Sequence, residues 1–481
     1  MYDIVVIGAG IVGGMIARRL SKFDLKLCIL EKENDVGMGA SRANSAIVHA
    51  GFDAKEDSYK AKLNVRGSEL MEEVTKELGV KYIRNESLVV AFAHERESIL
   101  ALYARGLKNG VRGLRILEHD ELHALEPNLN EDIDCALLAS TGAIVCPFEL
   151  CLAAVGNAMD NGAELKCNFE VVDIQKQDDT YTITAADGRQ VQTRYLINSA
   201  GLYSDKIADM TGDGGFTVHA RRGEYMILDR AYSDLTSRSI FHTPTKMGKG
   251  ILVTPSVHGN ILLGPTSVDI DDKEDLSTTP EGIANIFDKT SDNMKDIPFN
   301  QVITSFCGLR AVGDTGDFII REREGVVTLG GIESPGLSAS PAIAEYVEEL
   351  LLRAGLEASV KPNYTPFRTS PRTFGEMSAE EKNAVIARDP RYGHIVCRCE
   401  QITEGEIVAA IHQNPGARDI DGVKRRTRSG MGRCQGGFCS TVVLDILARE
   451  LKLSPIDITK FGRGSRILNR KTKGDDGHDI H

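Results

Sequence analysis

The sequence lacks a long hydrophobic run, a secretory signal and an excess of basic residues. No apolar stretch of about 18–20 residues occurs, so we expect no membrane-spanning helix. An apolar strand pattern begins near the first residue, without the charged and apolar regions of a signal peptide. Lys and Arg number 57 against 69 Asp and Glu, which gives a net charge of −12. A broad basic face is therefore not expected, and we predict no nucleic-acid partner.

Cysteine is also sparse, with ten in 481 residues. Six of them are scattered and do not form the pattern of a disulfide framework, so we expect small buried side chains. This usage indicates a reducing compartment, the cytoplasm, and leaves open attachment to the inner face of a membrane through a partner. The six are Cys28, Cys135, Cys146, Cys151, Cys167 and Cys307.

The chain is too long for one hydrophobic core, and its pattern predicts several units. A strand, a glycine turn, a helix and a second strand open the sequence, as in an α/β nucleotide-binding domain. Between about 216 and 300, short strands alternate with Gly, Pro and Asn, which predicts an antiparallel sheet inserted into that domain. We predict a linker at 361–390, a compact helical unit at 391–452 and a flexible polar tail at 462–481.

The opening segment predicts a dinucleotide site. Gly8, Gly10 and Gly13 follow an apolar strand with the spacing G-x-G-x-x-G, and Glu31 ends the next strand. These glycines allow a tight turn, a close approach to a pyrophosphate and close packing of helix on strand. The helix N-terminus offers N–H groups to phosphate, and Glu31 can accept a hydrogen bond from a ribose hydroxyl. The alternative is a glycine turn with a structural role only.

Two further segments favour FAD over NAD at this site. A loop of small and polar residues follows Glu31 and includes Ser41, Asn44 and Ser45, which suits a second approach to the pyrophosphate. Much later, Ala200 and Gly201 end another predicted strand with small residues. A nicotinamide-binding Rossmann domain needs neither segment.

These segments resemble the D-amino-acid-oxidase-like superfamily of flavoproteins. Additional motifs are similar to those of bacterial type II glycerol-3-phosphate oxidases, and L-2-hydroxyglutarate oxidases share several of them. In chain order the motifs are Ser41–Gly51, Arg222–Tyr225, Pro244–Gly250, Leu263–Thr266, Gly308–Arg310 with Asp317-Phe318, and Ser334–Ala339.

The resemblance implies a fold and a set of cofactor contacts. The fold would be a Rossmann-like α/β FAD-binding domain with an inserted antiparallel β substrate domain, together spanning 1–360. FAD-binding parts would lie at about 1–80, 141–215 and 301–360, and substrate-domain parts at about 81–140 and 216–300. The implied FAD contacts also include Val171, Gly336, Leu337 and Ser338.

His49 is the candidate catalytic base. Oxidation of a secondary alcohol needs a group that takes the hydroxyl proton, and the ordinary imidazole pKa of about 6.5 suits this role near neutral pH. The resemblance implies that His49 lies beside the flavin ring. Two alternatives are a core histidine bonded to the backbone and a covalent link to flavin C8α.

An anionic substrate needs fixed cations. Arg310 offers a planar fork for phosphate or carboxylate, Lys249 a compact charge, and Ser334 a hydroxyl donor. The resemblance implies that these three side chains hold the phosphate of glycerol 3-phosphate. Lys249 is equally consistent with a solvated surface lysine. The segment that begins at Gly336 precedes a predicted helix, whose N–H groups suit negative charge on the reduced flavin.

Four cysteines near the end of the chain predict a metal site. Cys397 and Cys399 form Cys-x-Cys, and after a gap of 34 residues Cys434 and Cys439 form Cys-x4-Cys. Four thiolates suit either an iron–sulfur cluster or tetrahedral zinc. The surrounding glycines and basic residues favour iron, because amide hydrogen bonds and positive charge stabilise a reducible cluster. A solvated helix face is the alternative for the basic residues, which are Lys424, Arg425, Arg426, Arg428 and Arg433.

Residues 391–450 resemble the bacterioferritin-associated-ferredoxin-like [2Fe-2S] domain. They are most similar to the C-terminal part of the large subunit of anaerobic glycerol-3-phosphate dehydrogenases. Val396–Glu400 and the stretch from Arg426 to Gly436 carry this likeness. The resemblance implies a [2Fe-2S] cluster that receives electrons from the flavin.

Together the two sites predict an enzyme that passes electrons from a small anionic hydroxy substrate to FAD and then to a [2Fe-2S] cluster. We predict oxidation of glycerol 3-phosphate to dihydroxyacetone phosphate, with a second flavoprotein or another electron-accepting subunit as partner. The first alternative is an L-2-hydroxyglutarate or other 2-hydroxy-acid dehydrogenase. The second is a non-catalytic electron-transfer subunit.

Overall fold

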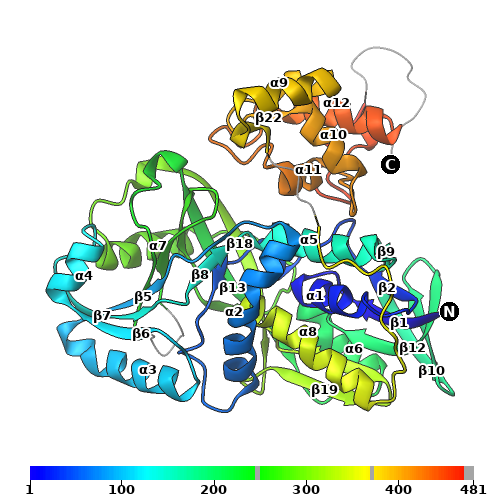
Figure 1. Ribbon diagram of the computed structural model, residues 1–481, viewed down its shortest axis with the longest axis horizontal. Coiled ribbons are helices and arrows are strands. Elements are labelled where there is room, and N and C mark those ends of the chain that lie inside the picture. The colour runs from blue at the N-terminus through cyan, green and yellow to red at the C-terminus, as the bar shows by residue number, and fades with distance from the viewer. Residues whose placement is uncertain (244–249, 369–372, 471–481) are drawn as a thin grey trace. The chain divides into compact units, whose positions relative to one another are not determined.

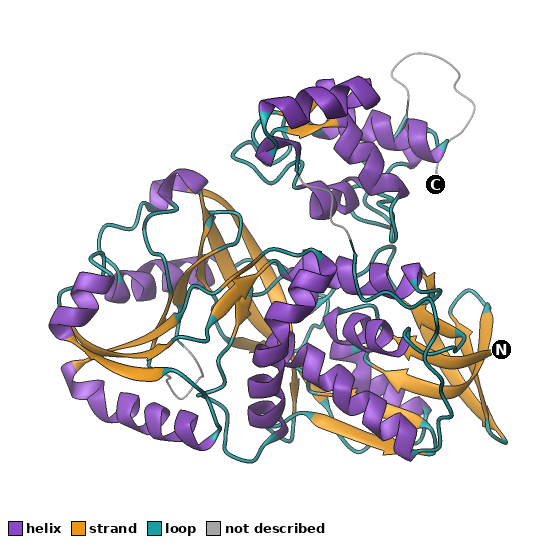
Figure 2. Ribbon diagram, viewed as in Figure 1, coloured by secondary structure: helices purple, strands orange, loops and turns teal. Residues whose placement is uncertain are grey.

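The computed structural model describes residues 1–243, 250–368 and 373–470 (Figure 1). The chain divides into two compact units, Met1–Ser370 and Pro371–His481. The first contains two large sheets, whereas the second is mainly helical, with one short strand pair (Figure 2). In the described part of the chain, no helix is both long and apolar enough to cross a membrane.

The first sheet forms the nucleotide-binding half of the first unit. Its strands run in the order β10-β11-β12-β1-β2-β9. β20 also pairs with β12, and β19 pairs with β20. β1 pairs in parallel with both β2 and β12, which is the arrangement expected of a βαβ start. The strands are β1 (Tyr2–Ile7), β2 (Leu27–Leu30), β9 (Glu164–Lys166), β10 (Val171–Gln177), β11 (Thr180–Ala185), β12 (Gln190–Asn198), β19 (Ile319–Arg323) and β20 (Val326–Gly330).

Helices packed beside this sheet bury its largest apolar core. α1 (Ile11–Leu20) packs against α5 (Pro147–Asp160) and α8 (Gly336–Arg353), and α8 also packs against α2 (Tyr59–Leu78). Gly14 permits the close approach of α1 to α5, because a Cβ there would lie 3.0 Å from Val155 Cγ2. The short α6 (Ser204–Met210) contacts β20 and β10.

The second sheet forms the substrate half. Its strands run in the order β17-β13-β16-β15-β14-β5-β7-β6, and the long strand β18 pairs with β13. The strands are β5 (Ser87–Phe92), β6 (Leu114–Glu118), β7 (Ile133–Ala139), β13 (Val218–Leu228), β14 (Ser239–His242), β15 (Leu252–Pro255), β16 (Ile261–Gly264), β17 (Val268–Ile270) and β18 (Val302–Gly313). Its helices are α3 (Arg96–Lys108), α4 (His119–Leu125) and α7 (Pro280–Asn293).

This sheet differs from the sequence prediction in two ways. β14 pairs in parallel with β5, so the sheet is mixed where an antiparallel one was predicted. β18 lies within 301–360, which was predicted to bind FAD, yet it pairs along its length with β13. The reason is that β18 and β13 form a long antiparallel ribbon, which extends the substrate sheet beyond residue 300.

A small third sheet connects the two halves. β8 (Ala143–Val145) pairs with β3 (Ile47–Val48) and with β4 (Tyr82–Ile83). β8 is buried and leads directly into α5 of the nucleotide-binding half. β3 immediately precedes His49, so this sheet fixes the position of the candidate base.

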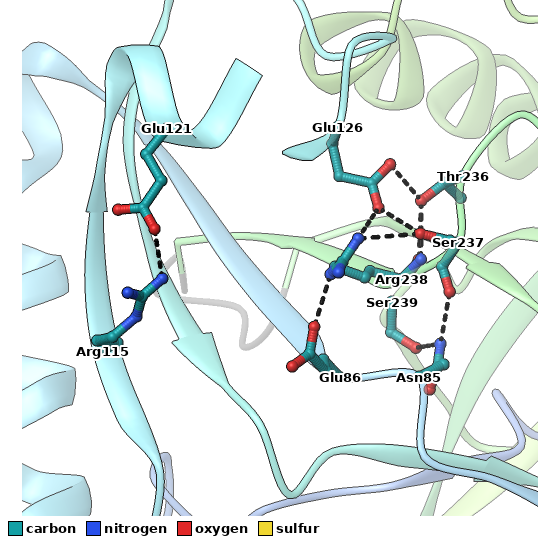
Figure 3. Close-up of polar contacts among 9 residues, drawn as sticks. All are labelled: Asn85, Glu86, Arg115, Glu121, Glu126, Thr236, Ser237, Arg238 and Ser239. Carbon is teal, nitrogen blue, oxygen red and sulfur yellow. Dashed lines mark hydrogen bonds and ion pairs between the residues drawn. The ribbon is translucent and has the colours of Figure 1, made fainter. Parts of the chain in front are cut away.

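A buried ion-pair network lies at the start of β14 (Figure 3). Arg238 places Nη1 3.1 Å from Glu126 Oε1 and Nε 2.8 Å from Glu86 Oε2. The Glu126 side chain is only 4% exposed, and it also accepts hydrogen bonds from Thr236 and Ser237. Because a buried carboxylate is costly without a cation, the ion pair with Arg238 stabilises Glu126 in this position.

We expect Arg238→Met to lower the free energy of unfolding by about 3–5 kcal/mol, since it leaves Glu126 buried without its cation. The matched control is Arg115→Met, which breaks the exposed pair with Glu121, also drawn in Figure 3. That loss should be within about 0–1 kcal/mol, because exposed ion pairs contribute little. Denaturant unfolding of both variants measures the difference, and equal losses would contradict the role assigned to Arg238.

The second unit is built around three helices, α10 (Glu404–His412), α11 (Ile420–Thr427) and α12 (Ser440–Leu451). Their apolar side chains form one separate core, which includes Ile407 and Leu447. A capping box begins α10, since Thr403 accepts from Glu406 N–H and Glu406 accepts from Thr403 N–H. A strand pair, β21 (Ile395–Cys397) with β22 (Ile402–Thr403), precedes α10.

The structure differs from the predicted linker at 361–390. Up to Arg368 the chain follows the first unit, where Lys361 N–H bonds Lys22 O and Arg368 N–H bonds Glu77 O. From Phe374 onward it belongs to the second unit and includes α9 (Ala379–Arg388), which a capping box at Ser378 begins. Polar composition alone did not reveal this capped helix. In the predicted tail, 462–470 includes a turn beside Thr459, and the remainder lies outside the described residues.

Candidate active site and cluster site

The glycine turn after β1 has the geometry that the sequence predicts. Gly8 has a φ of +101°, and a Cβ there would lie 2.5 Å from Ser199 O. A Cβ on Gly13 would lie 2.0 Å from Gly8 O, so the helix packs directly on the turn. Gly10 is the N-cap of α1 and supplies no side-chain acceptor to the first-turn N–H groups. The turn therefore fits a pyrophosphate at the helix N-terminus.

Glu31 is buried next to this turn. Its Oε2 accepts from Ala9 N–H at 2.9 Å and its Oε1 from Glu33 N–H at 3.0 Å. Burial raises the pKa of Glu31, although the two N–H groups oppose that shift. The carboxylate is thus fixed at the carboxyl end of β2, where a ribose would lie beside a bound pyrophosphate.

The loop after β2 docks onto the same turn. Ser41 Oγ accepts from Ile11 N–H at 2.8 Å, which attaches the loop to the first residue of α1. Asn44 shapes the loop, because its Oδ1 accepts from Ala46 N–H at 2.9 Å and Ala46 has a φ of +63°. Ser45 lies 3.2 Å from the Tyr225 hydroxyl, oxygen to oxygen, and so connects the loop to the substrate sheet.

Val171, Ala200 and Gly201 lie at the same edge of the first sheet. Val171 and Ala200 pack against an apolar cluster that contains Ile7 and Leu30, the last residues of β1 and β2. Gly201 has a φ of +57° and starts a short 3₁₀ turn. The structure therefore brings these three residues to the carboxyl ends of the strands that carry the glycine turn and Glu31.

The N-terminus of α8 contacts the segment that contains His49. Ser338 Oγ accepts from His49 N–H at 2.8 Å and donates to Ile47 O at 3.3 Å. Gly336 is the first residue of α8, and Leu337 packs against the main core of this half. The first turn of α8 is thus held beside β3, with its N–H end close to the candidate base.

His49 and Ser334 are side by side. His49 Nε2 lies 3.5 Å from Ser334 Oγ, and the imidazole ring centroid is 5.8 Å from that of Phe241. The backbone N–H of His49 is bonded to Ser338, which anchors the residue through its main chain. The arrangement can therefore present an imidazole nitrogen and a hydroxyl to one small substrate.

Arg310 has an unsatisfied buried nitrogen. Its Nη2 donates to Thr266 O at 3.2 Å, whereas Nη1 is buried and lacks a hydrogen-bond partner among the described residues. Gly223 makes room for the guanidinium, because a Cβ there would lie 2.9 Å from Nη2. A buried donor without a partner is costly, which fits a site completed by an anionic ligand. Lys249 lies outside the described residues.

Tyr225 is a polar side chain of this region that the sequence analysis did not select. Its ring stacks on Phe306 with centroids 4.7 Å apart, and its hydroxyl lies 3.2 Å from Ser45 Oγ. Burial raises the pKa of Tyr225, and the nearby Arg310 acts in the opposite direction. The signal was present in the motif Arg222–Tyr225, where alternation along a strand places Tyr225 on the same face as Gly223, the residue beside the Arg310 guanidinium.

In the second unit the structure gathers the four predicted ligands. Cys399 Sγ lies 3.6 Å from Cys434 Sγ, and the thiols of Cys397 and Cys439 are hydrogen-bonded to each other. Two thiolates on one tetrahedral metal ion are about 3.8 Å apart, and the separation of 3.6 Å between Cys399 Sγ and Cys434 Sγ fits that spacing. A Cβ on Gly432 would lie 2.3 Å from Cys399 Cβ, which explains why glycine stands there.

Backbone amides point at these sulfurs. The hydrogen bond with Cys439 lowers the pKa of Cys397 to about 5, and N–H groups of Gly430 and Glu400 also lower it. Burial opposes ionisation of Cys434, yet the N–H group of Phe438, the Cys399 thiol and further amides hold its pKa below the ordinary value. Such amide bonds to sulfur stabilise a negatively charged cluster.

The basic residues near the cluster are engaged in structural contacts. Arg428 Nε lies 2.9 Å from Glu400 Oε2, and Arg426 Nε donates to Pro415 O at 2.9 Å. Arg425 is buried and has Nη2 3.9 Å from Asp419 Oδ1. Two of the five predicted basic residues, Arg425 and Arg428, are therefore paired with carboxylates within the unit.

Comparison with known families assigns both units. Residues 3–350 match the family described as FAD dependent oxidoreductase. The chain belongs to this family. Residues 395–449 match the BFD-like [2Fe-2S] binding domain, which contains all four clustered cysteines. The predicted FAD and [2Fe-2S] cofactors are thereby confirmed, and so is the predicted fold class, to which the parallel β14–β5 pair is a local exception. The four thiolates alone were compatible with zinc as well, and the match to a [2Fe-2S] binding domain identifies the bound group as an iron–sulfur cluster.

Three relatives of this oxidoreductase show how far the likeness extends. A glycerol 3-phosphate dehydrogenase of Caloramator mitchellensis is 46% identical and covers 99% of this chain and 100% of its own length. The dithionite-reduced L-alpha-glycerophosphate oxidase of Mycoplasma pneumoniae with FAD bound has a TM-score of 0.74 at 30% identity, over 77% and 99% of the two chains. A mitochondrial L-2-hydroxyglutarate dehydrogenase of Pongo abelii is 30% identical and covers 72% of this chain and 87% of its own length.

Proposed function

We propose that this FAD-dependent oxidoreductase oxidises glycerol 3-phosphate to dihydroxyacetone phosphate and delivers the electrons through its [2Fe-2S] cluster to a partner. The observation that carries the proposal is the end-to-end similarity to a glycerol 3-phosphate dehydrogenase, which includes both units. The local geometry supports it with an anion site and a base on neighbouring segments.

Arg310, Ser334 and Lys249 are proposed to hold the phosphate. The buried Nη1 of Arg310 supports this role, because a phosphate oxygen would satisfy the donor in a charge-assisted hydrogen bond. Ser334 stands next to His49 and can donate its hydroxyl to the same substrate. Binding the phosphate at a fixed place orients the secondary alcohol toward the base.

His49 is proposed to take the hydroxyl proton at Nε2. Its backbone is fixed by the bond to Ser338, and its ring contacts Phe241 and Ser334, which supports a positioned nitrogen. FAD, when bound, supplies the acceptor for the hydride that leaves C2 of the alcohol. Proton and hydride together account for the two electrons and two hydrogens removed from the substrate.

The cofactor contacts are proposed as the sequence predicts them. Their supporting observation is that they gather at one edge of the first sheet and at the N-terminus of α8. The proposed residues are Gly8, Gly10, Gly13, Glu31, Ser41, Asn44, Ser45, Val171, Ala200, Gly201, Gly336, Leu337 and Ser338.

The electron acceptor is proposed to be a second flavoprotein or another redox subunit, in the cytoplasm or at the inner face of the membrane through that subunit. Phe438 is 82% exposed between Cys434 and Cys439, which gives a partner an apolar contact next to the cluster. No disulfide joins the ten cysteines, all of which lie in the described part of the chain, and this supports a reducing compartment.

We expect Cys434→Ser to abolish electron delivery to the partner while flavin reduction by substrate proceeds at the wild-type rate, because the cluster acts after the flavin. The matched control is Cys167→Ser, a half-buried cysteine outside the cluster. Stopped-flow absorbance of the flavin and reduction of an added acceptor protein separate the two steps. Wild-type delivery by Cys434→Ser would remove the cluster from the electron path.

L-2-hydroxyglutarate is the second candidate substrate. The 30% identity to an L-2-hydroxyglutarate dehydrogenase favours it, and the Arg310 fork suits a carboxylate as well as a phosphate. Anaerobic titration with each compound distinguishes the two, because only the true substrate bleaches the flavin at catalytic rates. If neither compound reduces the flavin, the non-catalytic electron-transfer subunit becomes the better account.

A further inference from the structure

A cluster of Cys146, Glu149 and His258 lies outside the proposed active site. Cys146 is the N-cap of α5, and Glu149 is three residues later on the same helix. Residues three apart face the same side of a helix, so the thiol and the carboxylate are neighbours. His258 comes from the turn between β15 and β16 of the substrate sheet.

The three donor atoms are close enough to share one ion. The Cys146 sulfur, a Glu149 oxygen and a His258 nitrogen all lie within 4.8 Å of one another. His258 Nε2 is 2.8 Å from Glu149 Oε1. Around a tetrahedral zinc ion, such donor atoms would be about 3.3–3.6 Å apart. Movements of about 1 Å or less bring the group to that geometry.

Both elements that carry these donors are rigid. Pro147 occupies the first position of α5, directly after Cys146, which is 3% exposed. The turn that carries His258 is closed by Ser256 N–H to Asn260 O at 2.7 Å and Gly259 N–H to Ser256 O at 3.0 Å. Preorganised donors lose little conformational freedom when they bind an ion, which raises affinity.

We propose that Cys146, Glu149 and His258 bind a zinc ion. A thiolate, an imidazole and a carboxylate are the three donor types that zinc takes in proteins, whereas Mg²⁺ and Ca²⁺ require oxygen ligands. The Glu149 and His258 side chains are 26% and 20% exposed, so water can complete a four-coordinate shell. When zinc binds Nε2 of His258, the single ring hydrogen of the imidazole is carried on Nδ1; Glu149 binds as a carboxylate, and the Cys146 thiol releases its proton to solvent.

The ion would brace the two halves of the first unit next to the active site. α5 belongs to the nucleotide-binding half, and the β15–β16 turn to the substrate sheet. Cys146 directly follows β8, which pairs with β3, and β3 ends one residue before His49. Cys146 also packs in one cluster with Ile47 and Ala50, on either side of His49. Zinc here would fix the strand that positions the base.

For the test, the iron–sulfur cluster of the full-length protein is first reconstituted. The protein is then exposed to Zn²⁺, the excess Zn²⁺ is removed, and the zinc, iron and flavin contents are measured. Wild type and the control His219→Gln, a surface histidine, should retain about one zinc per FAD. His258→Gln and Cys146→Ser should retain at least tenfold less zinc, with unchanged iron. Zinc K-edge absorption should report one sulfur among the ligands, which separates this site from zinc held by the four cluster thiolates.

Zinc retained equally by wild type and His258→Gln would overturn the proposal. A wild-type protein that retains no zinc would also overturn it, and so would a zinc K-edge spectrum that reports four sulfur ligands. His258→Gln keeps the test decisive if Cys146→Ser fails to fold, because His258 is on a surface turn. None of these outcomes depends on glycerol 3-phosphate oxidation, so the zinc site stands or falls separately from the proposed activity.

Discussion

Replacing His49 with alanine is expected to slow flavin reduction by glycerol 3-phosphate by about 10²–10⁴-fold, the usual contribution of a general base. The loss should be in the reduction step, since Arg310 and Ser334 still bind the substrate. The acid limb of the pH–rate profile, which reports protonation of the base, should disappear in the variant. Anaerobic stopped-flow absorbance across pH measures both effects.

The control for His49→Ala is His219→Ala, which removes an exposed imidazole from the substrate sheet. Both variants should contain as much FAD as the wild type, because the nucleotide contacts are left intact. A His49→Ala protein with full FAD content and wild-type reduction rate would show that another group takes the proton. A His49→Ala protein without FAD would instead point to the covalent or purely structural role.

Replacing Arg310 with methionine is expected to lower kcat/KM by about 10²–10³-fold, which corresponds to about 3–4 kcal/mol of lost binding to a buried anion. Most of the effect should appear as a higher KM, because the phosphate is bound in the ground state as well. Methionine fills a similar volume, and it removes the unsatisfied Nη1 donor from the folded protein. Protein stability should therefore change little.

Arg221→Met is the matched control for Arg310. Arg221 lies directly opposite Arg310 in the β13–β18 register, and it is paired with Asp269. Its loss should change kcat/KM by less than about twofold, because its guanidinium is already bonded to Asp269 in a partly exposed ion pair, which contributes little. Equal losses in the two variants would assign the effect to the general charge of the sheet and contradict a specific anion site at Arg310.

Local signals were sufficient to predict the framework of the nucleotide-binding half. Glycines at fixed spacing after an apolar strand have few alternative structures, so Gly8, Gly10 and Gly13 were identified with their roles in the turn. The four clustered cysteines were equally informative, because thiolates at that spacing have few other uses. Both features depend on residues close together in the sequence.

Features that depend on distant strands were harder to predict. The parallel pairing of β14 with β5 joins residues about 150 positions apart, and no local pattern specifies it. Tyr225 contacts Ser45 only because β13 reaches the loop after β2. The contacts of Arg428 with Glu400 and of Arg426 with Pro415 likewise needed the folded unit, since a run of basic residues does not reveal its partners.

The most direct test of the account is anaerobic addition of glycerol 3-phosphate to the full-length protein while the visible spectrum is recorded. The account predicts bleaching of the flavin bands, followed by loss of the iron–sulfur absorption in the same molecules. Substrate and electron path would then be established together. An unchanged flavin spectrum with glycerol 3-phosphate, in protein that carries both cofactors, would contradict the proposed activity.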